Sequence, residues 1–158
     1  MQIQVNREPS TSPAVRALVY CALDELNRRY GANADDHSLH FEELDPPNGA
    51  FFVARIDGHL AGGVALRTIT DPADRVAEVK RLWVRPDLRK FGVAQRLMSE
   101  LETWATEAGF LTIYLETGDR QPEAIAFYSR INYERVTAFP EGAEHYPEGL
   151  KFKKDLSA

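Results

Sequence analysis

The sequence predicts an α/β protein of the α+β type, with a single mixed β-sheet of about seven strands covered by helices. Strand-like segments outnumber helical ones along the 158 residues. Two strands are joined by Asp57-Gly58, a strong hairpin signal that makes neighbours antiparallel. Other strands are separated by amphipathic helices, which serve as crossovers. For this length we expect one domain, residues 1–158.

The elements follow one another in the order β-α-loop-β-β-β-α-β-α-β-β. The first helix is clearly delimited, because Ser12 and Pro13 begin it and Gly31 ends it. The other boundaries come from apolar periodicity and from the proline and glycine between segments. The expected strands are residues 3–8, 51–56, 60–70, 77–84, 111–117, 133–139 and 150–154, and the expected helices are 13–30, 93–108 and 122–131.

The rest of the chain is organised around residues 77–109, which read as a strand, a short basic turn and an amphipathic helix. Gly92 removes a side chain where the helix begins, so backbone N–H groups can approach a ligand closely. Free amides at a helix N-terminus, beside cations, are typical of a phosphate site. The alternative is a plain strand–turn–helix connection with solvated basic residues. The cations around the turn are Arg85, Arg89, Lys90 and Arg96.

Composition and charge exclude several classes of protein. The hydrophobic fraction of 44% is ordinary for a globular domain, and the net charge of -5 argues against nucleic-acid binding. No apolar run approaches the ~20 residues that span a bilayer, and the first residues lack the apolar core of a secretory signal. The single cysteine, Cys21, fits a reducing compartment. We therefore expect a cytoplasmic protein without a membrane partner.

Two further features have a functional and a plainer interpretation. Cys21 has no base nearby in sequence, which favours a packed thiol over a nucleophile. His37 and His40 lie near several acids, but their spacing is not that of a zinc helix and no second cluster completes a ligand set. We expect no metal, and a solvated loop or a substrate-facing segment there.

Three blocks of the sequence together resemble the GNAT (Gcn5-related N-acetyltransferase) superfamily. The signature Q/R-x-x-G-x-G/A is matched by Arg89, Gly92 and Ala94. E-V-K-R-L-W-V-R-P, before the signature, is similar to the family's central strand. P-E-A-I-A-F-Y-S-R-I-N-Y resembles the later helix and turn, usually written A-x-x-F-Y-x-x-x-G-F. The spacing of the blocks also fits, and the resemblance covers nearly the whole chain.

The resemblance implies a largely antiparallel sheet with a central splayed parallel pair, and acetyl-CoA bound between those two strands. The pantetheine arm would pair with backbone near Leu82 and Val84, and the pyrophosphate would lie on the amides of the basic turn. The implied cofactor-binding residues are Leu82, Trp83, Val84, Arg89, Lys90, Phe91, Gly92, Val93, Ala94, Gln95, Gln121 and Tyr128.

The chain departs from the family at three positions. Lys90 stands where many members have glycine, which adds a charge beside the expected pyrophosphate. Gln121 stands where an asparagine often begins the tyrosine-bearing helix, which leaves one polar cofactor contact open. Asn132 replaces the usual glycine before the final aromatic, and asparagine can adopt the left-handed conformation required there.

The implied reaction transfers an acetyl group to a primary amine in a ternary complex. An amine with a pKa of ~10.4 must lose a proton before it attacks. Glu78 is the candidate base, because several members have a glutamate four residues before the position of Leu82. Water is the other candidate base. The plainer interpretation of Glu78 is a surface carboxylate paired with Lys80 or Arg81.

Two other groups complete the implied chemistry. The backbone N–H of Leu82 or Val84 is the natural donor to the charge that develops on the thioester oxygen. Tyr128 resembles the family's general acid, and its alternative role is packing on the apolar face of a helix.

A different class of function is an acetyl-CoA sensor or interaction module without transferase activity. A nucleotide-binding enzyme is disfavoured, because neither G-x-x-x-x-G-K-[ST] nor G-x-G-x-x-G occurs. The resemblance implies a small-molecule or protein amine as the acceptor, and we expect its pocket to draw on residues 37–43, Arg67 and residues 141–146. Acids in these segments would favour cationic acceptors. Many family members pair, so a homodimer is a possible assembly.

Overall fold

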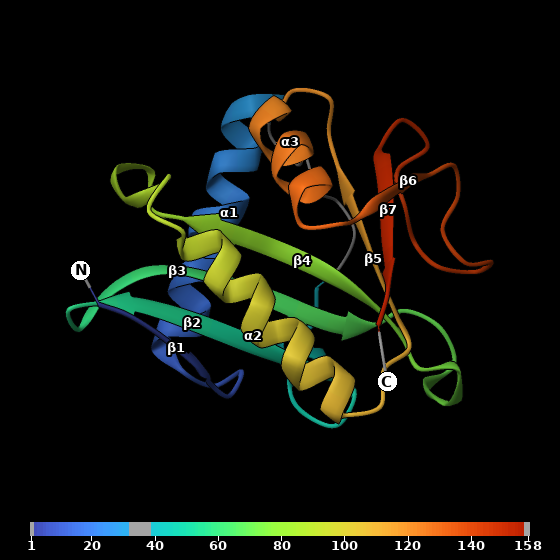
Figure 1. Ribbon diagram of the computed structural model, residues 1–158, viewed down its shortest axis with the longest axis horizontal. Coiled ribbons are helices and arrows are strands. Elements are labelled where there is room, and N and C mark those ends of the chain that lie inside the picture. Colours follow the sequence, from blue (N-terminus) through green and yellow to red (C-terminus); the bar gives the residue numbers. More distant parts are fainter. Residues whose placement is uncertain (1, 32–38, 157–158) are drawn as a thin grey trace.

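One mixed sheet forms the centre of the molecule (Figure 1). The computed structural model describes residues 2–31 and 39–156, and in this part of the chain seven strands are ordered β1-β2-β3-β4-β5-β7-β6. Neighbouring strands are antiparallel except β4 and β5, which confirms the predicted sheet and its parallel pair. The strands are β1 (Ile3–Arg7), β2 (Gly49–Ile56), β3 (His59–Thr68), β4 (Val76–Val84), β5 (Thr112–Thr117), β6 (Glu134–Val136) and β7 (Leu150–Asp155).

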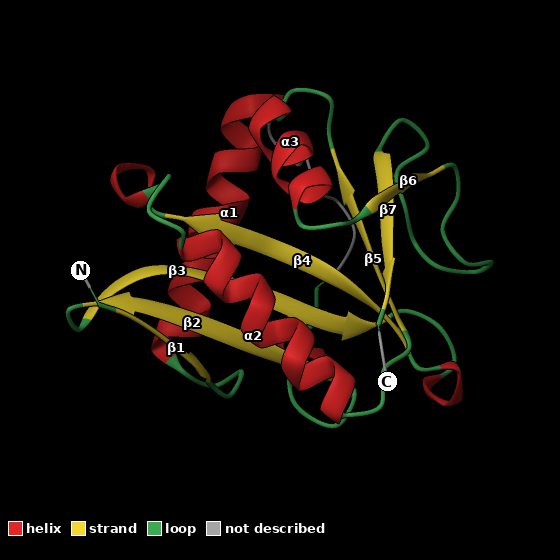
Figure 2. Ribbon diagram, in the orientation of Figure 1, coloured by secondary structure: helices red, strands yellow, loops and turns green. Residues whose placement is uncertain are grey.

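Helices cover both faces of the sheet (Figure 2). Helix α1 (Pro13–Tyr30) packs on one face, and α2 (Val93–Glu107) and α3 (Pro122–Arg130) pack on the other. Each interface has its own buried cluster, with Leu97 and Leu101 in the larger one and Val15 and Phe51 in the smaller one. None of the helices in the described residues is long and apolar enough to cross a membrane.

Local sequence signals explain most element boundaries. The Ser12 hydroxyl accepts the Ala14 N–H at 3.2 Å, and Gly31, at φ 97°, ends α1 where predicted. The hairpin at Asp57-Gly58 has positive φ at both residues, as its turn type requires. Asn132 has a φ of 73°, which confirms the left-handed conformation expected of it.

The sixth strand is the clearest difference from the sequence prediction. It was expected over residues 133–139 and spans Glu134–Val136. Tyr133, before the strand, is buried and donates its hydroxyl to Glu102 on α2 at 2.8 Å. Phe139, after it, turns its ring onto Tyr114 of β5 at 5.4 Å. Because side-chain packing holds both ends of the segment, the ladder with β7 is short.

The parallel strands β4 and β5 part after a short ladder. The pairing joins Val76–Glu78 to Thr112–Tyr114, three residue pairs in all. Further along β4 the register with β3 shifts between Gly63 and Ala65, so Val64 faces two residues of β4. Arg81 lies in this bulge with a φ of 58°. A bulge bends and twists its strand, which is the physical reason β4 leaves β5 here.

The end of α1 is fastened to the loop between β5 and α3. The Tyr30 hydroxyl accepts the backbone N–H of Arg120 at 2.9 Å. Arg29 and Arg120 each donate from the guanidinium to the other's carbonyl at 3.1 Å. Arg29 also forms an ion pair with Glu123 of α3 at 2.6 Å. Because α1 packs on β3 and β4, these contacts, here called the α1 strap, connect the two sides of the splay.

A substitution at Gly118 would test how tightly the α1 strap is packed. A Cβ at this position would lie 2.1 Å from the Tyr30 hydroxyl. We expect Gly118→Ala to lower the free energy of unfolding by about 1–3 kcal/mol, the usual range for overpacking, measured by urea titration. In a Tyr30→Ala background the same change should lower it by well under 1 kcal/mol, because the colliding ring is gone. Equal losses in the two backgrounds would contradict this packing.

Candidate active site

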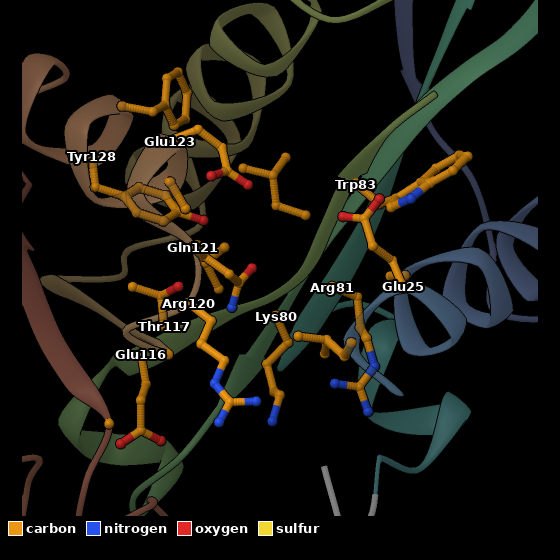
Figure 3. A pocket seen from close by; sticks show the side chains of 18 of the residues that line it. Glu25, Lys80, Arg81, Trp83, Glu116, Thr117, Arg120, Gln121, Glu123 and Tyr128 are labelled. Carbon is orange, nitrogen blue, oxygen red and sulfur yellow. The ribbon is translucent and has the colours of Figure 1, made fainter. Parts of the chain in front are cut away.

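A cleft of about 630 Å³ lies where β4 and β5 part, between α1 and α3 (Figure 3). Residues from α1, β4, β5, α3 and the loop before β7 line it. Most polar side chains come from β4 and from the end of β5 with its following loop. The residues that line it include Glu25, Tyr30, Glu78, Lys80, Arg81, Glu116, Thr117, Asp119, Arg120, Glu123, Tyr128, Tyr146, Glu148 and Gly149.

The structure brings most of the predicted site residues to this cleft. Two groups can be distinguished by their position. The residues that line the cleft are Glu78, Leu82, Trp83, Val84, Arg89, Ala94, Gln121 and Tyr128. The residues of the basic turn that lie outside its lining are Lys90, Phe91, Gly92, Val93 and Gln95. Val93 is buried in the core, whereas the other four are exposed.

The turn before α2 has the backbone of a ligand-binding loop. Gly92 precedes the helix with a φ of 86°, a conformation that favours glycine. The first amides of α2 have no partners within the helix. Lys90 also has a positive φ, 73°, which is uncommon for a residue with a side chain. Such an outlier suggests a functional reason for the lysine.

Most cations near the turn are already paired with carboxylates. Arg89 bonds Glu25 of α1 at 2.6 Å and the Val84 carbonyl at 2.8 Å. The two other arginines form more exposed pairs, Arg85 with Asp87 at 2.6 Å and Arg96 with Glu100 at 3.7 Å. Lys90 makes no ion pair within the described residues. The turn therefore offers amides and one uncommitted ammonium group to an anion.

Glu78 lies at the point where the two strands separate. It belongs to the last residue pair of the parallel ladder and is 3% exposed, so it is not a surface carboxylate. Arg67 of β3, directly opposite, holds its Oε1 at 3.2 Å and also lies 3.7 Å from Glu43. Burial raises the pKa of the Glu78 carboxyl, although Lys80 and Arg67 pull it down. A buried carboxyl whose pKa is raised accepts a proton more readily than an ordinary carboxyl, as a general base must.

Tyr128, on α3, lines the same cleft as Glu78. Its ring is 7% exposed and packs against Phe127, Tyr133 and Phe152, with ring centroids 5.4–6.0 Å away. The phenol points into the cleft (Figure 3). Burial raises the pKa of the Tyr128 hydroxyl, so it is protonated at neutral pH. Packing and proton donation are compatible here, because the ring is held while the hydroxyl reaches the open space.

Thr117, at the end of β5, carries an unsatisfied polar group on the cleft wall. Its hydroxyl oxygen is buried and has no hydrogen-bond partner among residues 2–31 and 39–156. Buried polar groups are normally paired, because an unmade hydrogen bond costs about 1–3 kcal/mol. An isolated hydroxyl in a cleft wall suits a ligand with polar groups along its length.

A buried ion pair fixes the loop that forms one wall of the cleft. Glu116 of β5 lies 3.0 Å from the Lys151 ammonium, and both side chains are under 10% exposed. The Glu116 carboxylate also accepts the Tyr146 N–H at 3.0 Å, and Lys151 donates to the Tyr146 carbonyl at 2.7 Å. Gly149 is required beside this pair, because a Cβ there would lie 2.2 Å from a Glu116 oxygen.

Sequence reasoning missed the residues that α1 and the pair Glu116–Lys151 contribute. Glu25 and Tyr30 lie on a helix whose pattern shows only an apolar face, and their partners are more than 60 residues away. Glu116 and Lys151 are alternating polar residues of two strands, with no local sign that both are buried. Long-range pairs of this kind have no signal in a single sequence.

Part of the expected acceptor region can be located. Arg67 bonds the Glu78 carboxylate but does not itself line the cleft. Tyr146 lines the cleft, whereas Glu141 does not. His37 lies outside the described residues. Within the described part of the chain, no group of three His, Cys, Asp or Glu side chains is arranged to hold a metal ion.

Comparisons with known proteins identify the class. The sequence profile of the Acetyltransferase (GNAT) family matches residues 19–133. The IAA acetyltransferase of Azospirillum brasilense is 32% identical over 158 residues, covering 98% of each chain. The uncharacterized N-acetyltransferase YjgM of Escherichia coli is 26% identical and covers 84% of this chain and 88% of its own.

Solved structures agree on the fold. A GNAT-family acetyltransferase from Staphylococcus aureus superposes with a TM-score of 0.79 at 15% identity, over 99% of this chain and 100% of that one. The PaiA N-acetyltransferase from Thermoplasma acidophilum, solved in complex with coenzyme A, has a TM-score of 0.71 at 16% identity, over 98% and 99%. The chain belongs to the GNAT acetyltransferase family, and acyl transfer is its class of reaction.

The Glu116–Lys151 pair yields a stability prediction. We expect Lys151→Met to lower the free energy of unfolding by about 3–5 kcal/mol, because it leaves the Glu116 carboxylate buried without its cation. Adding Glu116→Gln should recover much of that loss, since the uncompensated charge is then removed. Urea unfolding of both variants measures this. Lys153→Gln, a half-buried lysine on the same strand but outside the cleft, is the control. No recovery in the double variant would contradict the assignment.

Proposed function

We propose that the whole chain acts as an acetyl-CoA-dependent N-acetyltransferase. It would transfer an acetyl group to a primary amine by direct attack within a ternary complex. One observation carries the proposal: the short parallel ladder opens into a cleft that contains a candidate general base and a candidate general acid. The general base is Glu78, where the ladder ends, and the general acid is the buried phenol of Tyr128. Family membership and the coenzyme A complex of the PaiA relative support the choice of cofactor.

The cleft suits the proposed cofactor in three respects. The half of β4 beyond Glu78 extends past its ladder with β5, so backbone groups on that edge are available to an extended pantetheine arm. The unsatisfied Thr117 hydroxyl adds a polar contact on the opposite wall. The amides of the turn before α2 and the Lys90 ammonium would hold the phosphates. Acetyl-CoA, when bound, supplies an activated thioester.

Residues of this chain would carry the proton transfers. Glu78 would accept the proton that the attacking amine loses, directly or through water, as the N–C bond forms and the C–S bond breaks. A backbone N–H of Leu82 or Val84 would stabilise the charge that develops on the thioester oxygen. Tyr128 would give its proton to the departing sulfur and recover one from solvent. No metal has a part in this scheme.

Binding and turnover together test the proposed function. Acetyl-CoA should raise the melting temperature by mass action, and free coenzyme A should appear only when an amine is added. ATP should give no comparable shift. Binding without transfer to any amine would instead favour the alternative of a sensor or interaction module, whereas absence of binding would refute the cofactor.

Glu78→Gln should show whether the carboxylate is the base. Its pKa is raised, so activity of the wild type should fall as pH drops through that value and the carboxylate takes up a proton. The glutamine side chain of the variant does not titrate and cannot act as a base. We therefore expect it to be slower by ~10²-fold between that pKa and the pKa of the amine, with the gap narrowing at both extremes. A pH–rate profile parallel to the wild type would exclude Glu78. Glu134→Gln, on the exposed face of β6, is the control.

Tyr128→Phe removes the phenol and keeps the packed ring. The thiol leaving group has a pKa of roughly 8.5, below that of the buried phenol, so proton donation should give a modest benefit. We expect kcat to fall ~10²-fold, the low end for a general acid, with acetyl-CoA affinity nearly unchanged. A change within about threefold, with chemistry rate-limiting, would make Tyr128 a packing residue. Tyr20→Phe, 67% exposed on α1, is the matched control.

A further inference from the structure

We propose that Arg67 is a positioning residue for the transfer reaction, and that Glu43 limits its action on Glu78. Arg67 holds one oxygen of the Glu78 carboxylate from behind the cleft and leaves the other oxygen to the substrate. Glu43 lies at the other end of the same guanidinium and shares its charge. The inference rests on the proposed function, in which Glu78 is the base, and adds the residues that prepare that base.

Arg67 reaches Glu78 across the sheet. The two residues are directly opposite each other in the antiparallel ladder of β3 and β4, where side chains of a pair lie on the same face. The Nε and Nη2 atoms of Arg67 lie 3.3 Å and 3.2 Å from the same carboxylate oxygen, Oε1. Arg67 does not line the cleft, whereas Glu78 does. The arginine therefore contacts the base without occupying the space of a substrate, and it leaves Oε2 to the cleft side.

The third guanidinium nitrogen of Arg67 is turned to a second carboxylate. Nη1 lies 3.7 Å from Oε2 of Glu43. Arg67 and Glu78 are both buried, whereas the Glu43 side chain is 34% exposed. One buried cation thus serves two carboxylates, of which one lines the cleft and the other reaches solvent.

The backbone fixes Glu43 in this position. It belongs to a short 3-10 helix, Phe41–Leu44, which Leu44 anchors by its complete burial. Gly49 of β2, which pairs with Arg67, gives this helix its room, because a Cβ at Gly49 would collide with the Glu43 carbonyl oxygen. The contact of Glu43 with Arg67 is therefore built into the packing of the 3-10 helix on the sheet.

This arrangement reconciles an arginine partner with a carboxyl that remains a base. An arginine in contact ordinarily lowers the pKa of a carboxyl, and a carboxylate that is stabilised too strongly takes up a proton poorly. Burial nevertheless raises the pKa of Glu78, and Arg67 offsets this only in part. Because Glu43 shares the guanidinium, Arg67 can orient the carboxylate without locking it in the charged form.

Titratable groups on the neighbouring elements surround the Glu78 carboxylate. Two of them act on its charge, since Lys80 lowers and Glu116 raises its pKa. Others are Tyr114, which pairs with it on β5, Glu25 on α1, and Glu123 and Tyr128 on α3. All of these groups are unchanged in variants of Arg67 and Glu43. A difference in titration between those variants and the wild type therefore reports on the Arg67 contact.

Direct titration of Glu78 tests the inference without any substrate. Its carboxyl carbon is followed by ¹³C NMR in protein labelled at glutamate, and Glu78→Gln identifies the signal. Arg67→Met should raise the midpoint, because the cation is lost while the burial remains. Glu43→Gln should lower it, because the guanidinium charge is then no longer shared. In an Arg67→Met background Glu43→Gln should have a smaller effect, since Glu43 acts through Arg67.

The acid limb of the pH–rate profile should move in the same two directions. The profile is measured as kcat/KM per unit of free amine, which reports the free enzyme. At the pH where the wild type is half-active, Arg67→Met should be slower by about fivefold or more. One pH unit lower, Glu43→Gln should be faster by about twofold, because a partly exposed pair is weakly coupled.

Arg67→Lys separates charge from orientation. It keeps the cation, so the acid limb should return close to that of the wild type. Lysine lacks the planar fork that places two N–H groups on Oε1, so part of the loss should remain on the plateau, where the carboxylate is charged in every variant. That residual loss measures the orientation that Arg67 provides.

Two matched controls distinguish this role from a contribution to stability alone. Arg55→Met breaks another arginine–glutamate pair, formed with Glu8 at 2.5 Å and outside the cleft. It should lower the melting temperature and leave the pH–rate profile in place. Glu42→Gln, at the exposed neighbour of Glu43, should change neither quantity. Melting temperatures also establish which variants are folded.

The outcomes separate this inference from the proposed function. A Glu78 titration that does not move in Arg67→Met and Glu43→Gln, or that moves in one direction in both, overturns the inference whatever the activity. If Arg67→Met does not fold, the downward shift in Glu43→Gln decides, and its absence overturns the inference. Shifts by NMR that the pH–rate profile does not follow overturn Glu78 as the base, and with it the positioning role of Arg67. Absence of any transfer overturns the proposed function, while the titration still decides the contacts.

Discussion

The short ladder between β4 and β5 is the constraint on which the rest of the site depends. Three residue pairs join the strands, and the bulge around Arg81 then turns β4 away. A parallel pair that continued would fill its own hydrogen bonds and leave no space in the sheet. The end of the pairing opens the cleft, exposes one backbone edge of β4 and puts Glu78 at its base. The base candidate and the free backbone edge of β4 are both positioned by where this pairing stops.

Charge pairing is the second organising feature. The buried pairs Arg67–Glu78 and Glu116–Lys151 lie on the strands that bound the splay, and both are nearly inaccessible to solvent. Buried ions are stable only when partnered, so each pair fixes the position of its strand and of the loop it touches. The α1 strap closes the same region from outside, through Tyr30 and Arg120. The walls of the cleft are thus joined by buried contacts, and the carboxylates of Glu78 and Glu116 both have cationic partners.

The fold was accessible to sequence reasoning because its signals are local. Ser12 and Gly31 delimit α1, Asp57-Gly58 turns the hairpin, and Gly92 begins α2. Apolar alternation located seven strands, and the resemblance located the parallel pair. The short β6 was missed because packing of Tyr133 and Phe139 overrode a strand-like composition. Glu78 and Tyr128 were candidates from the motifs, although the plainer surface interpretation of Glu78 did not anticipate its burial.

The sequence by itself determined the secondary elements, the basic turn with its glycine, and the family, because these depend on short-range periodicity and fixed spacing. Only the tertiary structure decided which charges neutralise one another. Glu25 meets Arg89, Tyr30 meets Arg120, and Glu116 meets Lys151 across 35 to 90 residues of chain. It also decided that Lys80 and Arg120 share a cleft with Glu78. The physical reason is that a pair's energy depends on distance and burial, and neither is encoded at one position of the chain.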